Sequence, residues 1–240
     1  MSLLRWLPKR LRQRIRDYAP RSFPDAGSCG AFYDARARLF RGDEAAILEY
    51  SSFDVQQRLF ERAVDALPPH GRILDIGCGF GHLLDFIEAK GFAHQGYHGI
   101  DLSEAMIEAS AARLAGRSDV SFESLDLMAE GIPEKSHEVA YIISVLGYPI
   151  GRDPMKSMMT MLGNVFRGCT DGLLFSHVMD GRRDRPLAFP TDPESLAAAC
   201  ERAFGARAEI HDDGVAFTYL MSLRHPADGT AVAPGGVKEE

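Results

Sequence analysis

An acidic residue followed by glycines at alternate positions is the chemically most informative stretch of this sequence. It reads Asp75-x-Gly77-x-Gly79-x-Gly81. Glycine lacks a Cβ atom, so the backbone can turn sharply here and approach a ligand closely. The fingerprint of dinucleotide-binding loops requires a third glycine at its sixth position, and His82 stands there instead. The spacing therefore favours a loop against a small ligand, with a carboxylate nearby, over a pyrophosphate cradle.

The flanking sequence places this loop between a strand and a helix. Residues 73–76 are apolar except for the acid, which is typical of a parallel strand covered on both faces. Residues 82–90 have helical spacing, and Gly91 is suited to end that helix. Further strands are expected over residues 97–103, 120–127, 138–144 and 172–177, helices over 154–167 and 192–204, and an antiparallel hairpin over 206–211 and 215–223.

Two more acids lie at or near the ends of the next two strands. Asp101 follows the glycine loop by about 20 residues, where a carboxylate can accept hydrogen bonds from both hydroxyls of a ribose. Asp126 ends the third expected strand. Ligands of open α/β sheets bind beyond the carboxyl ends of the strands. We therefore expect Asp75, Asp101 and Asp126 to surround one ligand site.

Strand-terminal acids around one glycine loop resemble the class I S-adenosylmethionine-dependent methyltransferases. The resemblance covers roughly residues 70–225. It implies an α/β fold with a doubly wound, seven-stranded, mostly parallel sheet that has one antiparallel edge strand. An N-terminal helical cover is expected ahead of it, with helices over residues 31–40 and 54–67. The structural alternative is an α/β domain that carries these acids without binding a ligand.

The resemblance also implies which residues hold S-adenosylmethionine. Asp75 is expected near the ammonium end, Asp101 at the ribose, and Asp126 with its neighbour at the adenine amino edge. Tyr33 either reaches the methionine end from the N-terminal segment or is a packed aromatic. The full set of expected cofactor contacts is Tyr33, Asp75, Gly77, Cys78, Gly79, Gly81, Asp101, Leu102, Met106, Asp126, Leu127 and Ser144.

The acceptor side is less clearly indicated. An acceptor is expected near the ends of the fourth and fifth strands, where His177 or Tyr148 can serve as general base for a hydroxyl. Each can equally be structural. The arginines of residues 181–186 can bind a carboxylate or phosphate, or be solvated. The helix over 154–167 is expected to bury a stripe formed by Met155, Met158, Met159, Leu162 and Phe166.

The composition is that of an ordinary globular protein with an uneven charge. The 240 residues carry a net charge of −7, but seven basic residues and one acid give residues 1–21 a charge of +6, which leaves −13 for the rest. Such a body repels polyphosphates, so no nucleic-acid partner is expected. The four cysteines are scattered without paired spacing, which predicts buried reduced thiols and no metal site.

The N-terminal region has a sequence character of its own. Leu11, Ile15 and Tyr18 share one face of an otherwise arginine-rich helix, which can contact an anionic membrane surface or pack its stripe on the body. No signal peptide or membrane span is indicated, so a cytoplasmic location is expected. The expected organisation is a helical arm and cover over 1–68, a cofactor-binding domain over 69–225 and a disordered tail over 226–240.

The predicted function is methyl transfer from S-adenosylmethionine to a small-molecule acceptor, with release of S-adenosylhomocysteine. One alternative is cleavage of another sulfonium bond, by cyclisation or aminocarboxypropyl transfer, which releases methylthioadenosine. Another is a cofactor-binding module without catalysis. The sequence indicates neither the acceptor nor the oligomeric state.

Overall fold

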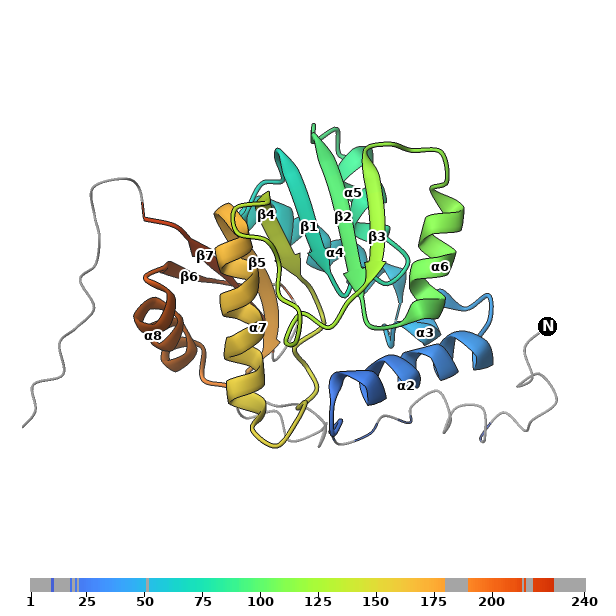
Figure 1. The fold of residues 1–240 in the computed structure, drawn as a ribbon, viewed down its shortest axis with the longest axis horizontal. Helices are drawn as coiled ribbons and strands as arrows, with labels where there is room; N and C mark the ends of the chain where they lie inside the picture. The colour runs from blue at the N-terminus through green and yellow to red at the C-terminus, as the bar shows by residue number, and fades with distance from the viewer. Residues whose placement is uncertain are drawn as a thin grey trace, which may run out of the picture.

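Seven strands form one sheet in the order β3-β2-β1-β4-β5-β7-β6 in the computed structural model of the chain (Figure 1). The structure describes residues 10, 18, 20, 22–50, 52–179, 190–212, 214 and 218–226. The strands are β1 (Arg72–Ile76), β2 (Gly96–Asp101), β3 (Val120–Ser124), β4 (His137–Ile142), β5 (Cys169–Val178), β6 (Arg207–His211) and β7 (Thr218–Arg224). The helices are α2 (Ala26–Leu39), α3 (Glu44–Ile47), α4 (Phe53–Ala66), α5 (His82–Ala89), α6 (Glu104–Arg113), α7 (Pro154–Gly168) and α8 (Pro193–Phe204).

The strand directions confirm the predicted doubly wound sheet. Strand β1 pairs in parallel with β2 and β4, which places Asp75 opposite Gly99 on one side and Tyr141 on the other. Strand β7 is antiparallel to both β5 and β6. The reversed strand therefore lies one place in from the edge, and β6 is the outermost strand.

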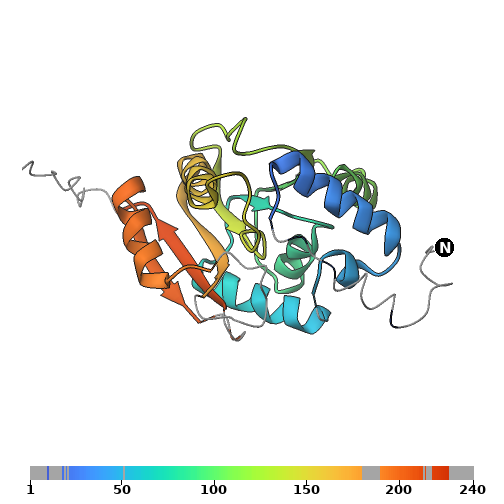
Figure 2. The same ribbon diagram turned by 90° about the horizontal axis from the view of Figure 1, so that it is seen from below.

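Helices cover both faces of the sheet (Figure 2). Ile73 packs in one buried cluster with residues of α4 and α5, such as Leu84, whereas Leu74 packs in a second cluster with residues of α7, such as Leu162. Successive strand residues point to opposite faces. Apolar residues therefore occur at successive positions of β1, Ile73 and Leu74, because the strand is buried on both sides.

Helix α2 lies across the carboxyl ends of the strands, below the sheet in Figure 1. It begins at Ala26, five residues earlier than predicted, because the Asp25 side chain accepts a hydrogen bond from the Ser28 amide at 2.7 Å and caps the helix. A Cβ atom on Gly30 would lie 2.3 Å from the Leu102 carbonyl oxygen. This glycine therefore lets the cover approach the loop that follows β2.

Two sequence-based expectations need correction. Strand β3 ends at Ser124, so Asp126 lies in the following turn instead of in the strand. Met155 is 40% exposed, while the other residues of its predicted stripe on α7 are buried or partly buried. The buried part of the stripe therefore starts one turn later, at Met158.

Three predicted features fall outside the described residues: most of the basic N-terminal helix, the arginine-containing loop 181–186 and the tail after residue 226. Among the helices that the structure describes, none has both the length and the apolar content needed to cross a membrane.

Candidate active site

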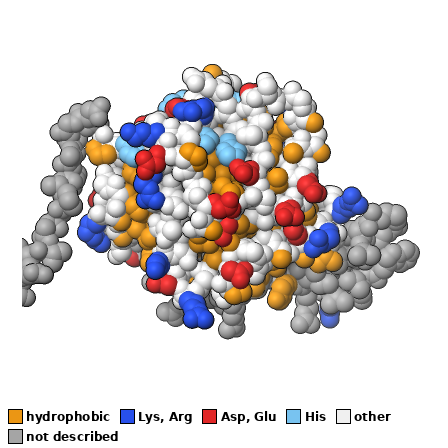
Figure 3. Space-filling view, in the orientation of Figure 1, with side chains coloured by type: hydrophobic (Ala, Val, Ile, Leu, Met, Phe, Trp, Pro, Cys, Tyr) orange, Lys and Arg blue, Asp and Glu red, His pale blue; other side chains and the backbone are white. Residues whose placement is uncertain are grey.

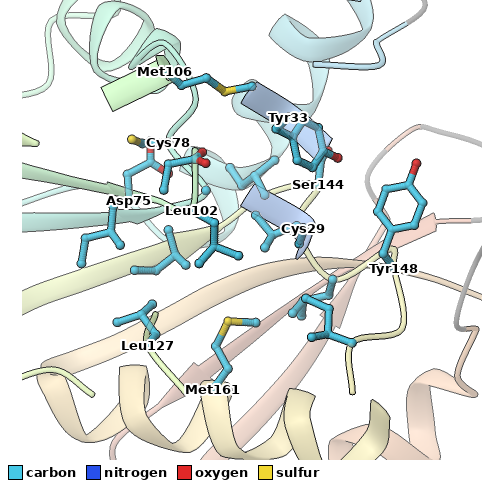
Figure 4. A pocket seen from close by; sticks show the side chains of 18 of the residues that line it. Cys29, Tyr33, Asp75, Cys78, Leu102, Met106, Leu127, Ser144, Tyr148 and Met161 are labelled. Carbon is cyan, nitrogen blue, oxygen red and sulfur yellow. The ribbon is translucent and has the colours of Figure 1, made fainter. Parts of the chain in front are cut away.

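A cavity of about 1340 Å³, counting its open mouth, lies at the carboxyl ends of the central strands (Figure 4). It brings together most of the residues singled out from the sequence. Those that line it are Tyr33, Asp75, Gly77, Cys78, Asp101, Leu102, Met106, Asp126, Leu127, Ser144 and Tyr148. Gly79, Gly81 and His177 are not part of its lining.

Asp75 occupies the buried end of the cavity. Its side chain accepts a hydrogen bond from the Tyr97 hydroxyl, and only 3% of the residue is exposed. Burial raises the pKa of this carboxyl group to about 7, although the Tyr97 hydrogen bond acts in the opposite direction. A positively charged group in the cavity would favour the ionised form. Nothing in the sequence marked Tyr97 as the partner of Asp75, because it was recognisable only as a residue of a predicted strand.

The glycine loop is shaped by close contacts. The amides of Gly77 and Cys78 donate to the Ile100 carbonyl oxygen at 2.7 and 3.1 Å, which ties the loop to the end of β2. Gly77 has φ +68°, and a Cβ atom there would lie 2.3 Å from Val145 Cγ2. Gly81 adopts φ +74° as the N-cap of α5. Some of the glycines thus build the loop without themselves lining the cavity.

Asp101 ends β2 with its carboxylate fixed in position. One oxygen accepts the Gly79 amide and the other accepts the Ser103 amide, each at 2.9 Å. Burial raises the pKa of Asp101, and these backbone hydrogen bonds lower it in part. A carboxylate oxygen has two lone pairs, so each can accept one further hydrogen bond from a ligand hydroxyl.

Asp126 follows β3 and is the third acid of the cavity lining. Its Oδ1 accepts the Met128 amide at 3.0 Å, which fixes the turn. Leu102 and Leu127, the residues that follow Asp101 and Asp126 in the chain, also line the cavity. Apolar side chains beside hydrogen-bond acceptors suit a flat heterocycle that carries amino and hydroxyl groups.

The end of β4 contributes a strained residue. Ser144 has φ +61°, a conformation uncommon for a residue other than glycine. Its amide donates to Ser176 Oγ at 2.7 Å, and its own Oγ accepts the Tyr50 hydroxyl at 3.0 Å. Tyr50 also lines the cavity. These bonds hold the turn that leads from β4 toward Tyr148.

The two candidate general bases are placed differently. Tyr148 lines the cavity, on the same side as Tyr33 in Figure 4. His177 is 2% exposed and meets the ring of Tyr219 edge-on, with centroids 6.0 Å apart. Its neighbour Ser176 is the residue that bonds to the β4 turn. The structure therefore brings Tyr148 to the site and buries His177 beside it.

Sequence reasoning missed two parts of the site. Glu49 accepts hydrogen bonds from Tyr33 and Tyr148, and no motif marked it. Met158 and Met161 of α7 also line the cavity. The methionine-rich composition of this helix was noticeable, but the sequence favoured a role in the core.

Titratable groups away from the cavity form separate clusters. His98 and His137 stack with ring centroids 5.5 Å apart, and histidines are visible near the top of the face in Figure 3, at the end of the sheet opposite α2. Burial, and then the charge of His98, lowers the pKa of His137 to about 4.

Among the described residues, one group has metal-ligating side chains close enough to share an ion, namely Glu88, His94 and Asp119. The guanidinium of Arg117 lies 2.7 Å from Glu88 and 2.5 Å from Asp119. A cation thus already neutralises this group, which we interpret as a surface ion-pair network. The four cysteines are buried and unpaired with one another, as predicted.

Comparison with known proteins identifies the family. Residues 74–175 match a family model described as a methyltransferase domain. A Mycobacterium tuberculosis (strain ATCC 25618 / H37Rv) protein with the name "Putative methyltransferase Rv1506c" is 46% identical over 168 residues. The match covers 67% of this chain and 97% of that protein. The chain belongs to the class I S-adenosylmethionine-dependent methyltransferase family. Its cofactor is S-adenosylmethionine.

Two further proteins are similar to this methyltransferase. Its fold matches that of magnesium protoporphyrin IX methyltransferase from Synechocystis PCC 6803, solved with bound cofactor, at a TM-score of 0.59 and 16% identity, covering 87% of this chain and all of that one. An S-adenosylmethionine-dependent Diels-Alderase of Talaromyces variabilis is 30% identical over 131 residues, which cover 53% of this chain. The match spans 42% of that fungal protein, less than half of its length.

Proposed function

We propose that this methyltransferase transfers the methyl group of S-adenosylmethionine to a small, largely apolar acceptor. The observation that carries the proposal is a single cavity whose lining combines acidic and apolar side chains. The acids are Asp75, Asp101 and Asp126, and the apolar side chains include Met158 and Met161. A cofactor and an acceptor can thus share one cavity beneath the N-terminal cover.

The acidic residues suit the cofactor. In this proposal, Asp101 accepts hydrogen bonds from the ribose hydroxyls and Asp126 from the adenine amino group, with Leu102 and Leu127 against the base. Asp75 provides negative charge at the buried end, where the ammonium group would lie. S-adenosylmethionine supplies an activated methyl group on its sulfonium, so the protein mainly needs to orient the acceptor and exclude water.

The apolar part of the lining suits the acceptor. Leu125, Leu146 and Ile150 belong to it, together with the two methionines of α7. Methionine side chains adapt to ligands of irregular shape because they are unbranched and polarisable. Tyr148 adds a hydroxyl to this side of the cavity. We therefore favour acceptors with an apolar ring or chain and one nucleophilic group.

Nucleoside analysis tests the proposal. The purified protein is incubated with S-adenosylmethionine and a panel of phenols, amines, indoles and carbon acids, and the nucleoside product is identified by mass spectrometry. Acceptor-dependent release of S-adenosylhomocysteine is expected. Release of methylthioadenosine would instead indicate cyclisation or aminocarboxypropyl transfer, and release of neither nucleoside would favour a binding module.

The similarity to the fungal Diels-Alderase favours a second candidate, in which the bound cofactor supports a ring-forming reaction of an apolar substrate. The methionine-lined wall would then hold a polyene, and the cofactor would not be consumed. Conversion of a diene substrate without release of S-adenosylhomocysteine would support this candidate over methyl transfer.

A further inference from the structure

Glu49 connects two tyrosines of the cavity lining, Tyr33 and Tyr148. Its Oε2 accepts the Tyr33 hydroxyl at 3.0 Å. The Tyr148 hydroxyl lies 3.0 Å from Oε1 and 2.9 Å from Oε2 of the same carboxylate. The two phenols come from α2 and from the loop after β4, so a single carboxylate joins the cover to the body of the enzyme.

The fold holds Glu49 in an unfavourable backbone conformation. Its φ is +61°, in the left-handed region that few residues other than glycine adopt. The buried Arg36 guanidinium supports the preceding turn by donating to the carbonyl oxygens of Ala46 and Ile47. It also lies 3.8 Å from Glu49 Oε1. Strain that is maintained by a buried cation points to a role for this side chain beyond packing.

We propose that Glu49 is the positioning residue for proton removal from the acceptor, through the phenol of Tyr148. This inference rests on the proposed methyl transfer. The acceptor's nucleophilic atom bonds to the methyl carbon while the carbon–sulfur bond breaks and leaves its electron pair on sulfur. The acceptor's proton passes to the Tyr148 oxygen, and the Tyr148 proton passes to Glu49. Loss of the methyl group neutralises the sulfonium, and uptake of the proton neutralises the Glu49 carboxylate.

The surroundings favour Tyr148 over Tyr33 as the phenol in contact with the acceptor. Tyr148 leads into the segment that contains Ile150 and Pro154, both in the cavity lining. Tyr33 comes from the cover, and burial together with the nearby Glu49 charge raises its pKa well above the usual value. Tyr33 therefore remains a hydrogen-bond donor that steadies the carboxylate.

A spectroscopic experiment tests the pair without any turnover. The protein is labelled with ¹³C at the Cζ atoms of its seven tyrosines, and Tyr148→Phe assigns the Tyr148 resonance by its loss. Glu49→Gln is expected to move this resonance because the charged acceptor of the phenol is removed. Glu44→Gln is the matched control, since Glu44 lies in the neighbouring α3 and pairs with His82 at 2.9 Å. An unmoved Tyr148 resonance in Glu49→Gln would contradict the proposal.

Kinetics with an acceptor found by S-adenosylhomocysteine release then test the proton path. Glu49→Gln is expected to lower kcat about 10²-fold, the lower range for loss of general-base help, with S-adenosylhomocysteine affinity changed by less than about threefold. Tyr148→Phe should have a similar effect, and the double variant little more. Glu44→Gln should stay within about twofold of the wild type.

The outcomes separate this inference from the proposed function. A Glu49→Gln enzyme with unchanged kcat, or one impaired only through KM or cofactor affinity, would make Glu49 a structural clamp and overturn the inference. If no acceptor is methylated, the proposed function fails while the resonance test still decides the Glu49–Tyr148 contact. If Glu49→Gln does not fold, Tyr148→Phe is tested in its place. A kcat of Tyr148→Phe equal to that of the wild type would overturn the proposal.

Discussion

Asp101, at the end of β2, accepts a hydrogen bond of 2.9 Å from the amide of Gly79 in the loop that follows β1. The two residues are 22 positions apart in the chain. Their contact joins the glycine loop to the carboxylate proposed to hold the cofactor ribose. The loop conformation and the ribose site are thus one structural unit, and a change in either residue should affect both.

Replacing Asp101 with alanine should weaken cofactor binding. Hydrogen bonds to a charged group contribute about 1.5–3 kcal/mol each, so loss of the ribose contacts should lower S-adenosylhomocysteine affinity at least about tenfold. Isothermal titration calorimetry measures this directly. Asp65→Ala, at an exposed position of α4, is the control for an acidic residue lost elsewhere. An Asp101→Ala protein that folds and binds as tightly as the wild type would remove Asp101 from the site.

The raised pKa of Asp75 predicts a specific pH dependence of stability. Its folded-state pKa is about 7 against an ordinary value of 3.8, so between these values the folded protein binds a proton more tightly than the unfolded chain. This contribution to stability is present at low pH and is lost as the pH rises toward 7. Asparagine at this position cannot ionise and should avoid the loss.

Urea unfolding at pH 5 and pH 8 tests this prediction. The free energy of unfolding of Asp75→Asn, relative to the wild type, should be about 3 kcal/mol higher at pH 8 than at pH 5. A difference that is the same at both pH values would show that Asp75 titrates normally in the folded protein.

Alanine substitutions at two glycines with positive φ distinguish the cost of backbone strain from the cost of a steric clash. Gly77 has φ +68°, and a Cβ atom added there would lie 2.3 Å from Val145 Cγ2. Gly116 has φ +89°, but a Cβ atom added there would have no neighbour within 4 Å. Gly116→Ala should cost about 1 kcal/mol of stability from backbone strain. Gly77→Ala should cost about 1–3 kcal/mol more because Val145 must move. Equal losses in denaturant unfolding would contradict the close packing of this loop.

The grouping of the three acids at one cavity could be predicted because parallel topology brings strand ends together. Asp75 and Asp101 each stand at or near the end of a predicted strand, so their common location followed once both strands were recognised. Asp126 was placed correctly beside them even though its strand ends two residues earlier, since the turn keeps it at the same edge. These positions depend on local patterns that the sequence carries directly.

The acceptor half could not be predicted because it depends on tertiary contacts. Glu49 meets Tyr148 across 99 residues of sequence, and no local pattern distinguishes it from a surface acid. His177 was a reasonable candidate near a strand end, yet side chains alternate along a strand, and the residue bonded to the β4 turn is Ser176. Met158 was expected in the buried stripe of its helix, and it is buried, but it also lines the cavity together with Met161. Periodicity does not distinguish a residue that packs in the core from one that lines a cavity.

The fate of the methyl group tests the central proposal most directly. S-adenosylmethionine labelled with deuterium in its methyl group is incubated with the enzyme and the acceptor panel, and both products are analysed by mass spectrometry. Methyl transfer predicts that the label appears in the acceptor, in an amount equal to the unlabelled S-adenosylhomocysteine released. Label retained on methylthioadenosine, or an acceptor converted without any label, would contradict it.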